Sequence, residues 1–447
     1  MTFTEYLTQL IEARKLSKNK LIRETGIDRS SFFQFLKGSR KPTGSQLTKI
    51  ALAAGFNTEE RSLLHELYVK EKYGEQTCLT WKTIRENLAK LDTMSPGEPK
   101  DTPVTRYLKK ICGTADSDSP ESGPLCFDVF IPISYFVGAD ISSVLASLTG
   151  MFAGTVSVRV ILVNFSDQDL PEQQLVEVCL QSILLSKDPR LDLKLYHYQG
   201  RYQRTDIPLI GYPFFILGSQ SILMINDLND QCTVLEDEGF LRQYADSFQG
   251  FLKKCRQLSY RNRDALSYAQ YLQQALGYSD SELLYTVEFL PCVFTVSPLD
   301  MVEKYTPPVF KGFARQYVSF CQGAIHMKQY FSPEGFDTFR REHMLYIAGG
   351  NIQLDQEDTE TLCSLIIDKL GPKYACLDSS RFRTSEEWCI ASGRKALLFS
   401  SYAKESVFVV SLDPQICSAF YNYFAHLEED GAEMLPDAAK CRLRQKN

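Results

Sequence analysis

Residues 17–42 read SKNKLIRETGIDRSSFFQFLKGSRKP, and this stretch decides the fold of the N-terminal region. Ser17 offers a side-chain oxygen that can cap a short helix, and Gly26 can end that helix because glycine adopts the left-handed conformation of a tight turn at little cost. Asp28 can then cap the next helix, which we expect to run from Arg29 to Lys37. The stretch therefore predicts two short helices joined by a tight turn.

Apolar residues at helical intervals extend this pair to five helices. The spacing predicts a first helix from Thr4 to Lys15, a fourth around Leu47 to Ala54, and a fifth that begins near Thr58. In the third helix the same spacing turns Phe32 and Phe35 inward and leaves a polar outer face. We therefore expect an all-α N-terminal domain.

Positive charge is concentrated in this region. Residues 1–50 contain ten Lys or Arg and four Asp or Glu, a balance of +6, whereas the whole chain has 49 and 55, a balance of −6. The remaining residues therefore carry 39 and 51, a balance of −12. A local basic face suits attraction to phosphate, and an acidic remainder limits indiscriminate binding to nucleic acid. The alternative is that these charges are ordinary solvated helix faces.

The N-terminal residues resemble the lambda-repressor-like, or xenobiotic-response-element type, helix-turn-helix regulators. The resemblance covers roughly one sixth of the chain and rests on the five-helix spacing and on these residues: Leu16, Ser17, Leu21, Thr25, Gly26, Ile27, Asp28, Arg29, Ser30, Leu36, Lys37, Gly38, Ser39, Arg40, Lys41, Pro42, Ile50, Ala51, Ala54 and Gly55. In that family the third helix enters the major groove of double-stranded DNA.

The resemblance implies two kinds of DNA contact. Base contacts are expected from Arg29, Ser30 and Gln34, and contacts to the DNA backbone from Ser17, Lys18, Ser31, Lys37, Arg40 and Lys41. The chain departs from the family at Phe33, which occupies an outer-face position that is usually polar. Phe33 either touches a thymine methyl group or packs on a neighbouring helix.

Composition bounds the rest of the chain. With 447 residues, 44% hydrophobic and 23% charged, the chain is typical of a globular protein of two or three domains. It has neither an apolar run of about 18 residues nor a charged-then-apolar leader, so we expect no membrane contact and a cytoplasmic location. The 13 cysteines include no Cys-x-x-Cys pair and are expected to be free thiols, mostly buried. We expect no metal site and no cofactor.

Breaks in composition divide the chain. Helices are expected from Leu79 to Leu91 and from Thr105 to Ile111, whereas Met94–Thr102 and Gly113–Pro124 are rich in Pro, Gly, Ser and Asp and are typical of flexible linkers. The predicted domains are residues 1–75, a helical connector and linker at 76–124, a first α/β half at 125–258, and a second α/β half with a helical insertion at 259–447.

Strands alternate with helices beyond Leu125, which predicts an α/β layer with a mainly parallel or mixed sheet. Strands are expected at Cys126–Phe136, Val156–Phe165, Leu191–Tyr198, Pro213–Leu217 and Ser221–Ile225, and helices at Leu170–Leu185 and Asp237–Cys255.

Two segments of this region share one pattern. Asp237 is followed by apolar residues three, seven and eleven positions later, and Asp413 is followed by the same spacing 176 residues further on. Each segment follows an expected hairpin, the second formed by Glu387–Phe399 and Ser406–Val410. The pattern indicates either a duplicated half or the ordinary apolar stripe of two unrelated helices.

A hairpin followed by a helix resembles the phospholipase D-like fold. That family's motif has a histidine, a lysine two residues later, an aspartate, and Gly-Ser-x-Asn. The first half contains only part of it, namely His197, Gln199, Asp206, Gly218, Ser219 and Ser221. The second half contains Ser392 and Gly393, and its His326-x-Lys328 precedes Pro333 where the aspartate belongs. Because that chemistry needs two cooperating histidines, we expect no hydrolysis, although a ligand-binding remnant stays open.

Together these features predict a DNA-binding transcription regulator whose C-terminal region is a sensor or dimerisation domain. One such domain contacts few base pairs, so a homodimer on a palindromic site is expected, and a small-molecule effector could act on it. We expect no catalytic residues, and we expect His65, His343 and His426 to be structural. The alternatives are a phospholipase D-like nucleic-acid phosphodiesterase targeted to DNA and a pure assembly module.

Overall fold

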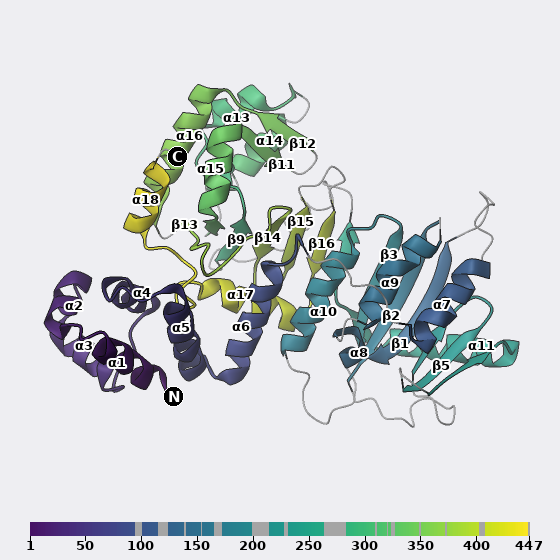
Figure 1. Ribbon diagram of the computed structural model, residues 1–447. Helices are drawn as coiled ribbons and strands as arrows, with labels where there is room; N and C mark the ends of the chain where they lie inside the picture. Colours follow the sequence, from purple (N-terminus) through teal and green to yellow (C-terminus); the bar gives the residue numbers. More distant parts are fainter. Residues whose placement is uncertain are drawn as a thin grey trace.

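The computed structural model shows an α-helical N-terminal region followed by an α/β region that contains two seven-stranded mixed sheets (Figure 1). It describes residues 1–445 except for 94–100, 115–123, 138–139, 153, 165–171, 199–213, 228–230, 263–282, 309–310, 320, 323–326, 348–349, 372 and 402–406.

Five helices make up the N-terminal domain, which we define as residues 1–75. They are α1 (Phe3–Ala13), α2 (Lys18–Thr25), α3 (Arg29–Leu36), α4 (Gly44–Ala53) and α5 (Thr58–Tyr73). The expected boundaries agree to within three residues. The core includes Leu7, Phe32 and Phe35, each at most 1% exposed, as the apolar spacing predicts.

Two further helices follow. Helix α6 (Glu75–Leu88) packs against α5, α10 and α17 and buries Trp81, Ile84 and Leu88. Helix α7 (Pro103–Thr114) packs beside the first sheet. Most of the two predicted linkers, Met94–Thr102 and Gly113–Pro124, lies outside the described residues.

The first sheet has the strand order β6-β5-β4-β1-β2-β3-β7. Its strands are β1 (Leu125–Pro132), β2 (Val156–Val163), β3 (Leu191–Tyr198), β4 (Phe214–Leu217), β5 (Ile222–Asp227), β6 (Gln231–Leu235) and β7 (Cys255–Gln257), and its helices are α8 (Ile133–Val137), α9 (Asp140–Met151), α10 (Glu172–Leu185) and α11 (Glu238–Leu252). The prediction of one strand from Cys126 to Phe136 is wrong at its end, because the chain turns into α8 directly after Pro132, which has no N–H for the ladder.

The second sheet has the strand order β13-β10-β9-β14-β15-β16-β8. Its strands are β8 (Tyr260–Asn262), β9 (Leu284–Glu288), β10 (Met327–Phe331), β13 (Tyr374–Cys376), β14 (Trp388–Ser392), β15 (Leu397–Ser401) and β16 (Phe408–Ser411). The other elements are a 3-10 turn (Val293–Thr295), α13 (Leu299–Tyr305), α14 (Lys311–Ser319), α15 (Pro333–Glu342), the β11 (Met344–Ile347) and β12 (Gly350–Gln353) hairpin, α16 (Gln356–Lys369), α17 (Pro414–Ala425) and α18 (Pro436–Arg444).

Six strands of each sheet have the same order and the same directions. In the first sheet β1, β2 and β3 run parallel, and β4, β5 and β6 continue antiparallel from the other side of β1. Strands β9, β10, β13, β14, β15 and β16 repeat this arrangement. Each set leads into a helix capped by an aspartate, Asp237 or Asp413. This match in topology supports the duplication interpretation.

The two halves meet through helices and through the segment that joins them. Helix α10 packs against α17, and residues 255–262 cross from the edge of one sheet to the edge of the other. Arg256 in this segment lies 3.6 Å from the buried carboxylate of Asp413. The two halves of the α/β region are therefore joined both by helix packing and by a segment that contributes a strand to each sheet.

Candidate nucleic-acid interface

Local hydrogen bonds fix the turn between α2 and α3. The N–H of Lys20 donates to the Ser17 hydroxyl (3.3 Å), and the N–H of Ser31 donates to the Asp28 carboxylate (2.8 Å). Gly26 has φ +67° and ends α2, and Ile27 after it is buried. The hydrogen bonds from Ser31 lower the pKa of the Asp28 carboxyl group. Helices α2 and α3 are therefore joined by a tight turn, and a side-chain cap stands at the start of each helix.

The predicted contact residues differ in exposure. Six are exposed, namely Ser17, Arg29, Ser30, Gln34, Lys37 and Arg40, whereas Lys18 and Lys41 are half-buried and Ser31 is buried. Arg29, Ser30 and Gln34 lie on the outer side of α3, opposite the buried Phe32 and Phe35. The three residues expected to contact bases therefore share one accessible surface.

Ser31 and Lys41 have hydrogen-bond partners within the protein. Ser31 is 6% exposed, because it lies four residues before Phe35 on the inner side of α3, and its hydroxyl accepts a hydrogen bond from Arg40 (3.1 Å). The Lys41 ammonium group donates to the backbone oxygen of Glu71 (2.7 Å) and lies 3.5 Å from the Glu71 carboxylate. In this structure Lys41 binds the carboxyl end of α5.

Phe33 is half-buried beside the exposed face. Its ring meets the edge of Phe32, with 6.4 Å between centroids and an angle of 87° between planes. The guanidinium carbon of Arg29 lies 5.8 Å from the Phe33 ring centroid, a cation–π distance. The ring contact of Phe33 is thus with Phe32 of its own helix, which does not bear out packing on a neighbouring helix, and contact with a thymine methyl group stays a prediction.

The partial phospholipase D-like motif does not come together in the first half. His197 lies near the carboxyl end of β3, and burial lowers the pKa of its imidazole. The sheet register places Gly218 three strands away and four residue levels from His197, roughly 20 Å, given about 4.8 Å between strands and 3.3 Å per residue. Gln199 and Asp206 lie outside the described residues.

The partial motif of the second half is not assembled among the described residues either. The Lys328 ammonium group pairs with the Glu433 carboxylate (2.6 Å), Pro333 begins α15, and His326 lies outside the described residues. Ser392 and Gly393 occupy the β14–β15 hairpin. Within the described part of the chain, no group of three or more His, Cys, Asp or Glu side chains is arranged to hold a metal ion.

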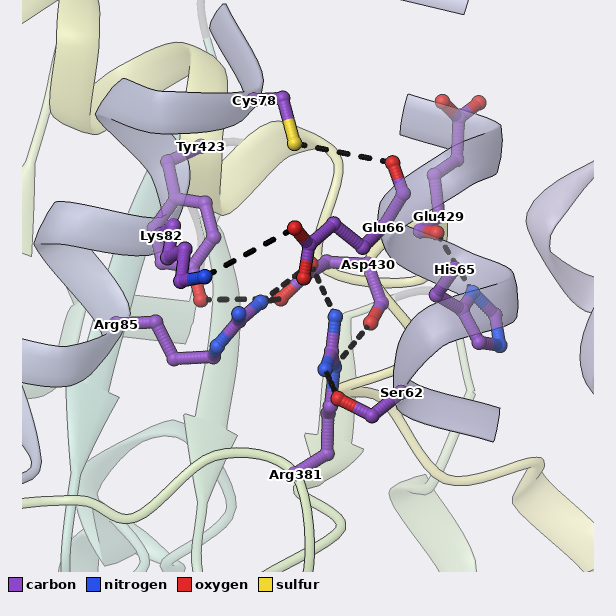
Figure 2. A network of polar contacts seen from close by, with 10 residues as sticks. All are labelled: Ser62, His65, Glu66, Cys78, Lys82, Arg85, Arg381, Tyr423, Glu429 and Asp430. Atoms are coloured by element: carbon purple, nitrogen blue, oxygen red, sulfur yellow. Dashed lines mark hydrogen bonds and ion pairs between the residues drawn. The ribbon is translucent and has the colours of Figure 1, made fainter. Parts of the chain in front are cut away.

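Sequence reasoning missed an interface between the N-terminal domain and the second half. It is formed by residues 428–433, which read EEDGAE and which we call the acidic loop; it joins α17 to α18. The Nδ1 atom of His65, on α5, lies 2.8 Å from the backbone oxygen of Glu429 (Figure 2). His65 is 3% exposed, and burial lowers the pKa of its imidazole to about 4, so the ring is neutral and Nδ1–H donates.

A buried carboxylate anchors the acidic loop. Arg85 of α6 donates from Nη1 to both carboxylate oxygens of Asp430 (2.6 Å each), and Arg381 donates from Nη2 to Oδ1 (3.0 Å) (Figure 2). The side chain of Asp430 is 4% exposed. Burial raises the pKa of Asp430, but Arg381 and Arg85 outweigh it and hold that pKa below its usual value. The ion triad therefore stays charged.

Side chains of the N-terminal domain also contact the acidic loop and the neighbouring Arg381. Lys72 pairs with the Glu429 carboxylate (2.7 Å), Tyr73 donates to that carboxylate, and Arg381 donates to the hydroxyl of Ser62. Such contacts join residues more than 300 positions apart. The only sequence signal for them is the acidic run itself.

No family model matches the chain, and no curated protein matches it. Among the described residues, no helix combines the length and the apolar character needed to cross a membrane.

Proposed function

We propose that this chain is a sequence-specific regulator of transcription that binds double-stranded DNA through α2 and α3 of a lambda-repressor-like N-terminal domain. The observation that carries the proposal is the exposed polar side of α3, which presents Arg29, Ser30 and Gln34. This helix follows a tight turn in which Gly26 ends α2 and Asp28 caps α3.

The dimensions and chemistry of α3 support this proposal. An α-helix with its side chains is about 10–12 Å in diameter, and the major groove of B-form DNA is about 12 Å wide, so the groove can admit α3. Arginine pairs with guanine through two hydrogen bonds, and glutamine pairs with adenine in the same way, so Arg29 and Gln34 suit base recognition. Ser17, Lys18, Lys37 and Arg40 flank that face and suit phosphate contacts.

The α/β region takes the role of a sensor or dimerisation domain in this proposal. A homodimer would place two N-terminal domains on half-sites about 34 Å apart, one helical turn of DNA. A small-molecule effector would regulate binding only if its affinity differed between two arrangements of the dimer. The distance between His197 and Gly218 gives the phosphodiesterase alternative no support.

A comparison of two kinds of variant tests the proposal. Once a preferred duplex has been selected from a random library, Arg29→Ala and Gln34→Ala should each weaken binding to it by about 1 to 3 kcal/mol and should affect random duplex much less. Lys37→Ala is the matched control for charge, because it should weaken all sequences alike and reduce the salt slope by about one. Equal losses on selected and random duplex for Arg29→Ala would rule out base recognition by this residue.

A further inference from the structure

The N-terminal domain is docked on the acidic loop through backbone as well as side chains. Gly44, the first residue of α4, lies so close to the loop that a Cβ built on it would be 2.7 Å from the backbone carbon and oxygen of Glu428. Only glycine permits this approach without a shift of one backbone against the other. The first turn of α4 is therefore covered by the acidic loop.

The docked loop brings negative charge next to the basic edge of the N-terminal domain. The loop contains four carboxylates and no Lys or Arg, and three of the four form ion pairs: Asp430 with Arg85 and Arg381, Glu433 with Lys328, and Glu429 with Lys72 of the N-terminal domain. Lys41 precedes Gly44 by three residues, at most about 11 Å of extended chain, and Arg40 precedes it by four. A phosphate bound near Arg40 would thus lie within roughly 20 Å of the loop.

This spacing makes docking unfavourable for DNA binding. One carboxylate about 10 Å from a phosphate in water weakens binding about twofold at low ionic strength. Screening has little effect at that distance in 0.01 M salt, where the Debye length is about 30 Å. Undocking would remove this repulsion from the DNA and would also leave Lys72 without its carboxylate partner, so that its charge adds to the basic surface.

The chain has a suitable pivot for undocking. A single residue, Gly74, connects α5 to α6, and it has φ +92°, a conformation that favours glycine. Helix α6 beyond it is held to the α/β region by the Arg85–Asp430 pair and by buried Trp81. A rotation of residues 1–73 about Gly74 would leave α6 in place and would separate α5 from α6, which pack against each other.

We infer that the acidic loop is an intramolecular clasp that holds the N-terminal domain in an arrangement unfavourable for DNA, so that DNA binding and docking oppose each other. This inference rests on the proposed function. The clasp consists of the contacts of Gly44, His65, Lys72 and Tyr73 with residues 428–431.

Carbodiimide cross-linking of the full chain measures docking directly. This zero-length reagent joins an amine to a neighbouring carboxylate, and Lys72 with Glu429 (2.7 Å) is such a pair across the clasp. The Lys304–Asp358 pair (2.7 Å), within the second half, serves as internal reference. Saturation with the selected duplex should lower the yield of the Lys72–Glu429 product relative to this reference. A yield that stays the same or rises would overturn the clasp.

Substitution of Gly44 tests the same point from the protein side. Gly44→Ala adds a Cβ against Glu428 and should lower the cross-link yield without DNA. It should tighten binding of the selected duplex about two- to fourfold in 0.01 M salt. Gly250→Ala, in α11, is the matched control, because its Cβ would meet nothing within 4 Å, and it should change neither quantity. Glu429→Gln, which removes one charge and keeps the backbone, should tighten binding about twofold.

The outcomes separate the clasp from the proposed function. If Gly44→Ala lowers the cross-link yield but DNA affinity is unchanged or weaker, the clasp is overturned while the DNA-binding function stands. If neither the original chain nor Gly44→Ala nor Glu429→Gln binds any duplex at low salt, the proposed function is overturned, and the clasp with it.

Discussion

Acid should destabilise the folded chain through His65. This side chain is 3% exposed and neutral, and it faces Arg381 and Asp430 across the domain interface and Arg61 on its own helix. We expect that replacing it by asparagine, whose amide can still donate to the Glu429 oxygen, removes one titration and keeps the contact.

The magnitude follows from the two pKa values of His65. Burial lowers its pKa from 6.5 to about 4 in the folded chain, whereas the unfolded chain retains 6.5. Between these pH values the unfolded state binds a proton that the folded state does not, so the stability present above pH 6.5 is lost as the pH falls toward 4. A difference of about 2.5 pKa units corresponds to about 3 kcal/mol.

Urea unfolding at pH 7 and pH 4 measures this effect, with the original chain compared with His65→Asn. Other titrating groups contribute to both proteins and cancel in the difference between them. The original chain should lose about 3 kcal/mol more than the variant on acidification. If both proteins lose the same free energy of unfolding, burial does not lower the pKa of His65 as we describe.

Three further substitutions test the local physics. Asp430→Asn leaves the guanidinium groups of Arg85 and Arg381 buried without a full counter-charge. It should lower the free energy of unfolding in urea by about 3 to 5 kcal/mol. A cost below about 1 kcal/mol would show that the triad is exposed in solution. Gly26→Ala should cost about 1 to 2 kcal/mol from φ alone, because its Cβ would meet nothing within 4 Å, and no thermal shift would contradict the left-handed turn. Asp28→Ala removes the cap of α3 and should cost about 0.5 to 2 kcal/mol in the same unfolding experiment, with an unchanged midpoint as the contrary result.

Local signals predicted elements well where the chain itself sets the conformation. Strand β3 runs from Leu191 to Tyr198 as expected, because a short run of leucine and tyrosine residues is bounded by Pro189 and Gly200. The start and end of α2 follow from Ser17 and Gly26, whose effects act within one turn of helix. Helix α8 was missed because Ile133–Val137 continues an apolar run, and apolar runs do not distinguish strand from helix.

The candidate interface was predictable only in part. Outward exposure of Arg29 and Gln34 follows from helical periodicity, but Ser31 lies at the border of the inner stripe, where periodicity alone does not decide burial. The partners of Lys41 and His65 depend on how distant segments pack, and no local pattern encodes such contacts. The acidic run at 428–433 is visible in the sequence, but its partners could not be predicted for the same reason.

Selection of bound sequences from a random double-stranded library tests the central claim most directly. We expect the full chain at low salt to enrich two half-sites with centres about 10 base pairs apart, which reports both base recognition by α3 and a dimer. A library that emerges without any enriched sequence, or a protein that binds no duplex at all, would contradict the account.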